Sequence, residues 1–177
     1  MNFIQRFLGH LKTVNNHRRM VRKLCFKAGL YWQGLTHDLS KYSPVEFWNG
    51  VKYFTGTASP HMGERKVLGY SKAWIHHHNI NKHHGEYWQD IDKTGHSCPV
   101  DMPNKYLMEM VCDRVAASMI YLKDKFTNRA PLEYYLSHKD ENQFSENTRV
   151  QLEKTLQFIA EEGIYNFLND YKTRKKK

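Results

Sequence analysis

The sequence has few cysteines, no long apolar run and no acidic residue before Asp38. Its three cysteines, Cys25, Cys98 and Cys112, are odd in number and form no CxxC motif. This disfavours a disulfide framework and a zinc-thiolate site, and a reducing cytoplasm is the expected location. No apolar run approaches the roughly 20 residues of a membrane-spanning helix. The N-terminus also lacks the apolar core and cleavage site of a signal peptide, so we expect no membrane association.

The charge of the chain is positive and unevenly spread. The 177 residues include 27 Lys and Arg against 18 Asp and Glu, a net charge of +9. Residues 1–37 hold seven of these bases. This balance suits an anionic partner such as a nucleotide or nucleic acid, and a solubilising surface with a frayed tail would also explain it. With 40% hydrophobic residues, we expect one domain over residues 1–171 and a basic tail over residues 172–177.

Apolar residues recur at helical spacing along most of the chain, and strand-like alternation is scarce. A first helix is expected to stop at Gly29. Another is expected to start with a capping box made by Ser43 and Glu46, with Pro44 in its first turn. Helices are expected over residues 43–54, 71–88, 103–123, 131–138 and 145–161 and near Ile164, with loops over residues 55–70 and 90–103. The prediction is an all-α, single-domain bundle of about six to eight helices.

Five of the eleven histidines fall in HHHNINKHH, residues 76–84. On a helix, one face would carry Trp74, His77, Asn81, His84 and Trp88. Histidine and asparagine are poor helix formers, so a break near residues 79–82 is also expected, bringing His83 or His84 in from another angle. The tract could be a solvated face, but the flanking tryptophans indicate buried imidazoles that need partners, and we predict that at least two bind metal. The histidines predicted to lie at the surface are His10, His61, His96 and His138.

Asp113 interrupts an apolar helical stripe. The stripe consists of Tyr106, Met110, Asp113, Ala117 and either Ile120 or Tyr121. A lone carboxylate among core positions usually protonates, pairs or binds a cation. A salt bridge to a distant Lys or Arg is one explanation, and metal ligation is the preferred one.

The dipeptide His37–Asp38 stands in the pentapeptide HDLSK, residues 37–41. Neighbouring side chains on a helix project about 100° apart, so these two could bind one ion only from its side. Residues from other elements would have to complete the ligand shell. His17 is the best upstream candidate, because Val14 and Val21 place it near an apolar face. The order along the chain is then His17, the HD pair, the histidine tract and Asp113.

In this order, the chain resembles the HD-domain superfamily of metal-dependent phosphohydrolases. It is most similar to the branch with extra histidines between the HD pair and the last aspartate, which holds two metals. More narrowly, HDLSKYSPVEF, WIHHHNINKHH and EMVCDRVAA resemble a small HD-like family of unknown function, over about residues 10–125. The signature of cyclic-dinucleotide enzymes after the histidine pair is absent, which leaves the exact substrate open.

The resemblance implies a ligand set for one or two divalent transition metal ions such as Mn, Fe, Co, Ni or Zn. It assigns the first ion to His17, His37, Asp38 and Asp113, and a second, bridged by Asp38, to His77, His83 and His84. The HDxxK pattern places Lys41 at a phosphate oxygen, so Asp38 and Lys41 are the expected catalytic residues. Asn81 and Arg18 are candidates for substrate binding. The substrate would be a nucleotide or another phosphate ester, hydrolysed by a metal-activated water.

Two other classes of function remain open. The HD scaffold also carries di-iron oxygenases with a similar ligand set and a lysine after the HD pair. A basic helical module that binds nucleic acid would instead predict a salt-sensitive affinity and no need for metal. Residues after about 125 add nothing to this interpretation of function, and we expect them to complete the bundle or cover the pocket. The sequence does not indicate the oligomeric state.

Overall fold

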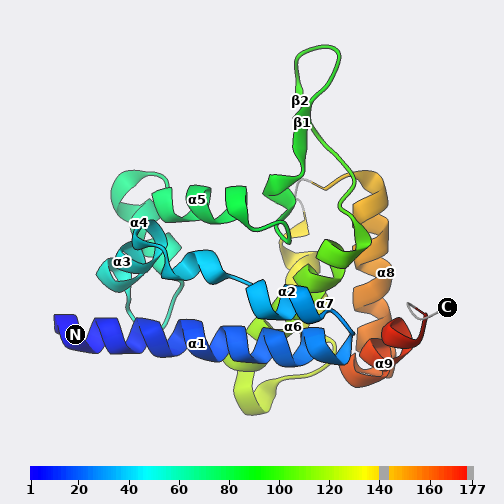
Figure 1. The fold of residues 1–177 in the computed structure, drawn as a ribbon, viewed down its shortest axis with the longest axis horizontal. Coiled ribbons are helices and arrows are strands. Elements are labelled where there is room, and N and C mark those ends of the chain that lie inside the picture. Colours follow the sequence, from blue (N-terminus) through cyan, green and yellow to red (C-terminus); the bar gives the residue numbers. More distant parts are fainter. Residues whose placement is uncertain (140–143, 175–177) are drawn as a thin grey trace.

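The computed structural model describes residues 1–139 and 144–174, which form a mostly helical single domain (Figure 1). The described α-helices are α1 Phe3–Lys27, α2 Tyr31–Thr36, α3 Pro44–Tyr53, α4 Pro60–Leu68, α5 Lys72–Ile80, α6 Asn104–Leu122, α7 Ala130–Ser137, α8 Glu146–Glu162 and α9 Ile164–Arg174. The 3-10 turns are η1 Leu39–Tyr42, η2 Gly85–Tyr87 and η3 Lys123–Lys125, and the strands are β1 Gln89–Ile91 and β2 Ser97–Pro99. The all-α prediction is confirmed. The described residues form nine α-helices, one more than the upper end of the expected range of about six to eight. Among the described helices, none combines the length and the apolar character needed to cross a membrane.

Helix α1 runs along one side of the molecule, with α3, α4 and α5 near its N-terminal end and α6, α8 and α9 near its C-terminal end (Figure 1). It starts with a capping box, in which the side chains of Asn2 and Gln5 each accept a hydrogen bond from the other's backbone N–H. It ends as predicted before Gly29, whose φ of 71° lies in the left-handed region that suits glycine. Not all of its apolar residues face the core, because Phe3 and Leu8 are exposed.

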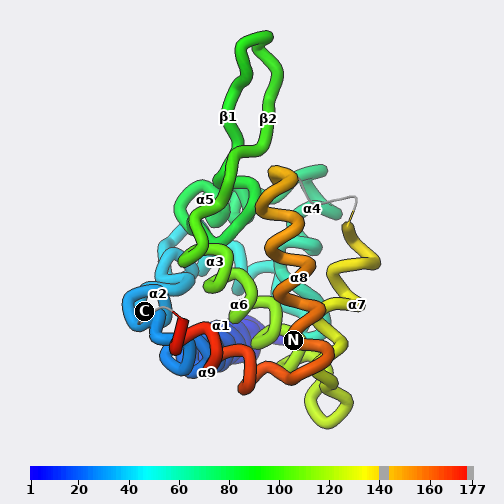
Figure 2. The backbone as a smooth tube through the Cα atoms, turned by 90° about the vertical axis from the view of Figure 1, so that its right-hand side faces the viewer, coloured from blue at the N-terminus to red at the C-terminus, as the bar shows by residue number. Residues whose placement is uncertain are grey.

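The main core lies between α1, α6, α8 and α9 (Figure 2). Val21 and Leu24 of α1 and Val111 and Val115 of α6 are fully buried there. Residues after 125 complete this core, because Leu152, Leu156, Ile159, Ile164 and Leu168 are also buried. Helix α9 continues to Arg174, so the predicted tail of residues 172–177 begins inside a helix, and residues 175–177 lie outside the described residues.

A smaller layer formed by α3, α4 and α5 covers the N-terminal half of α1 (Figure 1). Helix α4 corrects the expected loop over residues 55–70; its start is marked by Pro60 and its end by Gly69, at a φ of 79°. The expected loop over residues 90–103 is corrected too, because β1 and β2 pair there as an antiparallel hairpin. This hairpin projects from the body of the molecule in both views (Figures 1 and 2).

His10 joins α1 to this layer, which corrects its prediction as a surface residue. Its side chain is buried, and its ring centroid lies 5.3 Å from that of Phe47 and 6.1 Å from that of Phe54. Burial, with a smaller contribution from the charge of Lys41, lowers the pKa of His10 to about 4. The imidazole is therefore neutral and acts as a packing group.

Gly50 of α3 allows this close approach, and Gly50→Ala is expected to destabilise the fold. A Cβ atom at this position would lie 2.1 Å from Nε2 of His10, so the ring or the helix must move. Overpacking of this kind costs about 1–3 kcal/mol in the free energy of unfolding, measurable by urea denaturation. The control is the same substitution in a His10→Ala background, where the clash is absent. An equal loss in both backgrounds would contradict the assignment to the His10 ring.

Candidate metal centre

The HD pair lies in a sharp turn between α2 and η1. His37 follows the last residue of α2, and Asp38 has a φ of 54°, in the left-handed region. This conformation is uncommon for a residue other than glycine, although aspartate tolerates it better than most. Both side chains are directed into the protein, where His37 is 1% and Asp38 2% exposed. The local backbone strain therefore places two adjacent side chains at one buried position.

Arg18 holds this turn, and its predicted role in substrate binding stays a prediction. Its Nε donates a hydrogen bond to the carbonyl of His37 at 2.7 Å, and Nη2 donates to the carbonyl of Leu35 at 3.1 Å. Its Nη1 donates to the hydroxyl of Tyr42 at 3.2 Å. The guanidinium thus fixes the backbone on both sides of the HD pair from the α1 side.

The first group of ligand atoms combines three elements. Nε2 of His17, on α1, lies 2.8 Å from Oδ1 of Asp113, on α6. Nε2 of His37 lies 3.8 Å from the same oxygen and 3.6 Å from Oδ2 of Asp38. His17, His37 and Asp113 each offer a ligand atom within 4.8 Å of the others, so they could hold one ion with Asp38 at its side.

The second group gathers around the other oxygen of Asp38. Nε2 of His77 lies 3.3 Å and Nε2 of His83 lies 3.4 Å from Oδ1 of Asp38. His84 completes the group, with all ligand atoms within 4.8 Å of one another. The expected break in the histidine tract is confirmed, because α5 ends at Ile80 and the extended Asn81 turns the chain. The predicted helix over residues 71–88 is therefore too long.

Several ligand atoms of this cluster are buried without a hydrogen-bond partner among the described residues. They are Nε2 of His37, Oδ1 of Asp38, Nε2 of His83 and Nε2 of His84. Burying a polar atom without a partner costs about 1–3 kcal/mol, so such atoms seldom gather in one place without a ligand. Mixed imidazole and carboxylate donors suit a divalent transition metal. The described part of the chain thus contains buried groups that could hold one or two metal ions.

The electrostatics keep the carboxylates of the cluster ionised. Burial alone would raise the pKa of Asp38, but His37, Lys41 and the other cluster histidines hold it well below its ordinary value. Burial opposes ionisation of Asp113 in the same way, and the hydrogen bond and charge of His17 lower its pKa. Both side chains are therefore available as anionic ligands at neutral pH.

The histidines of the cluster divide into two kinds. Burial lowers the pKa of His37 and, further, that of His84, so both are neutral as metal ligation requires. Burial also disfavours the charged forms of His17 and His83, but neighbouring carboxylates outweigh it and raise both pKa values. In the metal-free protein, His17 and His83 therefore tend to carry protons that a metal ion would have to displace.

Lys41 and Asn81 lie at the edge of the cluster. The Lys41 ammonium is 3.5 Å from Oδ2 of Asp38, and its side chain is 22% exposed, so it is reachable from solvent. Asn81 donates through Nδ2 to the carbonyl of His77 at 2.8 Å and to Oγ of Ser40 at 2.7 Å. Asn81 thus closes the end of α5 and ties it to η1, and its predicted contact with substrate stays a prediction.

Two glutamates that sequence reasoning missed orient the histidines. Oε1 of Glu109 accepts hydrogen bonds from Nδ1 of His37 at 3.0 Å and from Nδ1 of His83 at 3.1 Å. These bonds direct the Nε2 atoms of both rings toward Asp38, the arrangement that fixes metal-ligating histidines. Glu109 precedes Asp113 by one helical turn, so the shared face of α6 was the available sequence signal.

Glu46 plays the same part for α5. Its carboxylate accepts from Nδ1 of His77 at 2.7 Å and from Nδ1 of His76 at 2.8 Å. This corrects the predicted capping box, of which only the bond from the Glu46 N–H to Oγ of Ser43 forms. His61 is also half-buried beside this layer, with its ring 6.3 Å from that of His77, so its prediction as a surface residue is wrong.

Glu109→Gln is expected to lower the affinity for a transition metal by about tenfold or more. The amide keeps the volume and one acceptor oxygen but loses the charge that two imidazole N–H groups share. A competition titration with a chromophoric chelator, using Co²⁺ or Zn²⁺, measures the change. The matched control is Glu133→Gln on α7, whose side chain is exposed and pairs only with Arg129 among the described residues. Equal affinities of the two variants would contradict an orienting role for Glu109.

The fold and the cluster together define a class: a mostly helical domain whose buried histidine and carboxylate side chains could hold metal ions. The chain belongs to a family of unknown function, DUF5662, whose model matches residues 6–158. No curated protein and no solved structure matches the chain. The matched span contains every residue of the two ligand groups and both orienting glutamates.

Proposed function

We propose that this protein is a metal-dependent phosphohydrolase of the HD type, acting on a nucleotide or another phosphate ester. The observation that carries the proposal is the position of Asp38. Its Oδ2 faces His37 at 3.6 Å, while its Oδ1 faces His77 at 3.3 Å and His83 at 3.4 Å. One carboxylate between two sets of ligands is the arrangement expected of a bridging residue in a two-metal hydrolytic site.

The residues of the cluster have separable tasks in this proposal. His17, His37 and Asp113 would hold one ion and His77, His83 and His84 the other, with Asp38 shared. Bound ions would supply an acidified water as nucleophile and neutralise charge on the phosphate. Glu109 and Glu46 keep the imidazole rings in the tautomer that leaves Nε2 free for ligation.

Lys41 is the proposed contact to the phosphate group. Its ammonium is reachable from solvent and lies within 3.5 Å of Asp38, so it stands where a bound phosphate would meet the metal ligands. Lysine provides a point charge on a flexible stem, which suits a non-bridging phosphate oxygen. The substrate itself is proposed only as a class, because the chain resembles a phosphohydrolase fold whose members cleave different phosphate esters.

The test is hydrolysis of a panel of nucleotides, cyclic nucleotides and phosphodiesters by the full chain loaded with Mn²⁺ or Co²⁺. Activity lost in His37→Gln and reduced in Lys41→Ala, with Lys72→Ala as an exposed-lysine control, supports the proposal. No turnover of any phosphate compound with either metal would count against it. Lys41 acting on phosphate should raise KM as well as lower kcat, because it contacts the substrate directly.

The same ligand set leaves one enzymatic alternative, a di-iron oxygenase, because imidazole and carboxylate donors also suit iron. Iron that copurifies with the chain, with oxygen consumption on a small organic substrate, would favour it over hydrolysis. A nucleic-acid-binding module would give salt-dependent affinity for DNA or RNA that His37→Gln does not change.

A further inference from the structure

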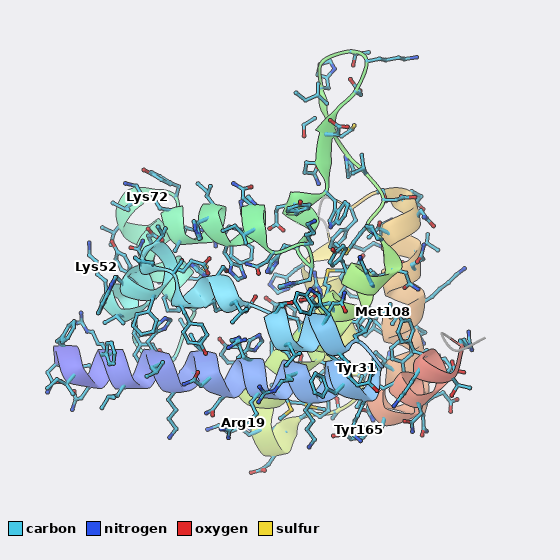
Figure 3. The ribbon with its side chains drawn as sticks, in the orientation of Figure 1. Arg19, Tyr31, Lys52, Lys72, Met108 and Tyr165 are labelled. Carbon is cyan, nitrogen blue, oxygen red and sulfur yellow. The ribbon has the colours of Figure 1, made fainter. Side chains whose placement is uncertain are left out.

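A cavity of about 180 Å³ lies on the flank of α1 that faces α2. Its lining residues are Asn15, Arg18, Arg19, Arg22, Gly34 and Tyr42. None of the metal-ligand candidates lines it, so it is a hollow separate from the candidate metal centre. Figure 3 labels Arg19 on α1.

No acidic side chain among the described residues forms an ion pair with the arginines of this cavity. Three of its six lining residues are arginines of one helix. The acceptors for the Arg18 guanidinium are two backbone carbonyls and the Tyr42 hydroxyl, which carry no negative charge. Arg19 and Arg22 are exposed and form no ion pair or hydrogen bond with the described residues. Like charges four residues apart on a helix, such as Arg18 and Arg22, repel and destabilise the helix unless an anion lies between them.

The donors of the cavity also suit a tetrahedral oxyanion. A guanidinium presents paired N–H groups that match two oxygens of a phosphate, and two arginines are free to do so here. The Tyr42 hydroxyl donates to Oδ1 of Asn15 at 2.5 Å, which leaves the Asn15 amide NH₂ directed away from that bond as a further donor. The cavity of about 180 Å³ is far larger than the roughly 10–15 Å³ that, on the same measure, one water molecule needs, so it has room for the five heavy atoms of inorganic phosphate.

We infer that the cavity between α1 and α2 binds a phosphate group through Arg19 and Arg22, with Arg18 as a fixed cation at its floor. This site goes beyond the proposed hydrolytic centre and does not depend on it. The phosphate could belong to a soluble anion or to a lipid headgroup. The second source has a specific basis, because Trp32 and Leu35 of α2, on either side of Gly34, are 72% and 50% exposed.

The test compares two double variants of the full chain, each lacking two positive charges of α1. Arg19→Ser with Arg22→Ser removes the cavity arginines, whereas Lys12→Ser with Lys23→Ser removes two exposed lysines that do not line it. Inorganic phosphate is titrated into chelator-treated protein by calorimetry, so that metal ions contribute no binding. Flotation with phosphatidylcholine vesicles, with and without phosphatidic acid, provides the lipid arm.

The arginine variant is expected to bind inorganic phosphate at least about tenfold more weakly than wild type, and the lysine variant within about twofold. Binding only to vesicles with phosphatidic acid, with the same dependence on the two variants, would support the site and identify the headgroup as the source. Equal loss in both variants would overturn the proposal in favour of a diffuse positive field. Failure of wild type to bind either probe would overturn it as well.

Discussion

Asp38→Asn is expected to remove tightly bound transition metal from both ligand groups at once. The reason is that each oxygen of this carboxylate faces a different group, Oδ2 toward His37 and Oδ1 toward His77 and His83. Loss of a residue that only orients a ligand costs about 10–100-fold in metal affinity, so loss of a shared ligand should exceed about 100-fold. Any phosphate hydrolysis should fall with it.

The metal contents expected for three variants show whether Asp38 ligates both ions or only lies near them. Elemental analysis of the protein as purified should give the full content for wild type and none for Asp38→Asn. His17→Gln should lose only the ion of the first group, and His77→Gln only the ion of the second. This pattern follows because His17 approaches Asp113 at 2.8 Å, whereas His77 approaches only Asp38 and Glu46 among the carboxylates described.

The control for charge is Asp124→Asn, which removes an exposed carboxylate in η3 and should leave the metal content unchanged. Melting temperatures and circular dichroism of all variants report whether the fold survives. Asparagine is chosen because it preserves the volume and can keep the left-handed backbone at this position. A folded Asp38→Asn protein that retains the wild-type metal content would contradict the proposal that Asp38 bridges two ions.

The sequence predicted those features of the site that depend on local chain chemistry. The break at Asn81 follows from the weak helix propensity of the histidine and asparagine tract. The position of Asp113 on an apolar stripe indicated an inward-facing carboxylate, and the structure places it 2.8 Å from His17 with its side chain 20% exposed. Helix α1, the start of α3 at Pro44 and the start of α6 near Pro103 follow from caps and periodicity in the same way. Local rules were sufficient because each of these features is decided within one or two helical turns.

The features that were missed depend on where helices pack. Glu46 was expected to cap its own helix, but the packing of α3 on α5 places His76 and His77 within 2.8 Å of its carboxylate. Helix α4 was missed because the glycine and serine content of residues 55–70 outweighed the stop signal at Gly69. For Glu46, a tertiary contact decides between roles that the sequence allows equally.

Addition of a divalent transition metal is expected to raise the melting temperature of the chelator-treated protein by about 5–10 °C. A ligand at 100 times its dissociation constant stabilises the folded state by about 2.7 kcal/mol, and a domain of this size gains about 2–4 °C per kcal/mol. The structural reason is that buried atoms such as Nε2 of His37 and Oδ1 of Asp38 have no hydrogen-bond partner among the described residues. Differential scanning fluorimetry with Mn²⁺, Co²⁺ or Zn²⁺ measures the shift.

Metal bound to surface histidines could also change the melting temperature. Two matched variants therefore test whether the rise comes from the buried cluster. His96→Gln removes an exposed histidine of the hairpin and should keep the full shift. His37→Gln removes a ligand of the buried cluster and should abolish most of it. If both variants kept the wild-type shift, the stabilising ion would lie elsewhere.

The rise in melting temperature caused by metal should also become smaller as the pH falls. This direction follows from the pKa values of His17 and His83. Both have pKa values raised above the ordinary 6.5, because neighbouring carboxylates outweigh the cost of burial. In the metal-free fold their protonation is stabilising below the pKa of the unfolded chain, and this contribution is lost as the pH rises through the raised pKa. Metal ions require the neutral imidazoles, so protons and metal compete for the same two side chains. The melting temperatures with and without metal should therefore converge toward pH 6 and separate toward pH 8, whereas a shift that is constant across this range would argue against histidine ligation.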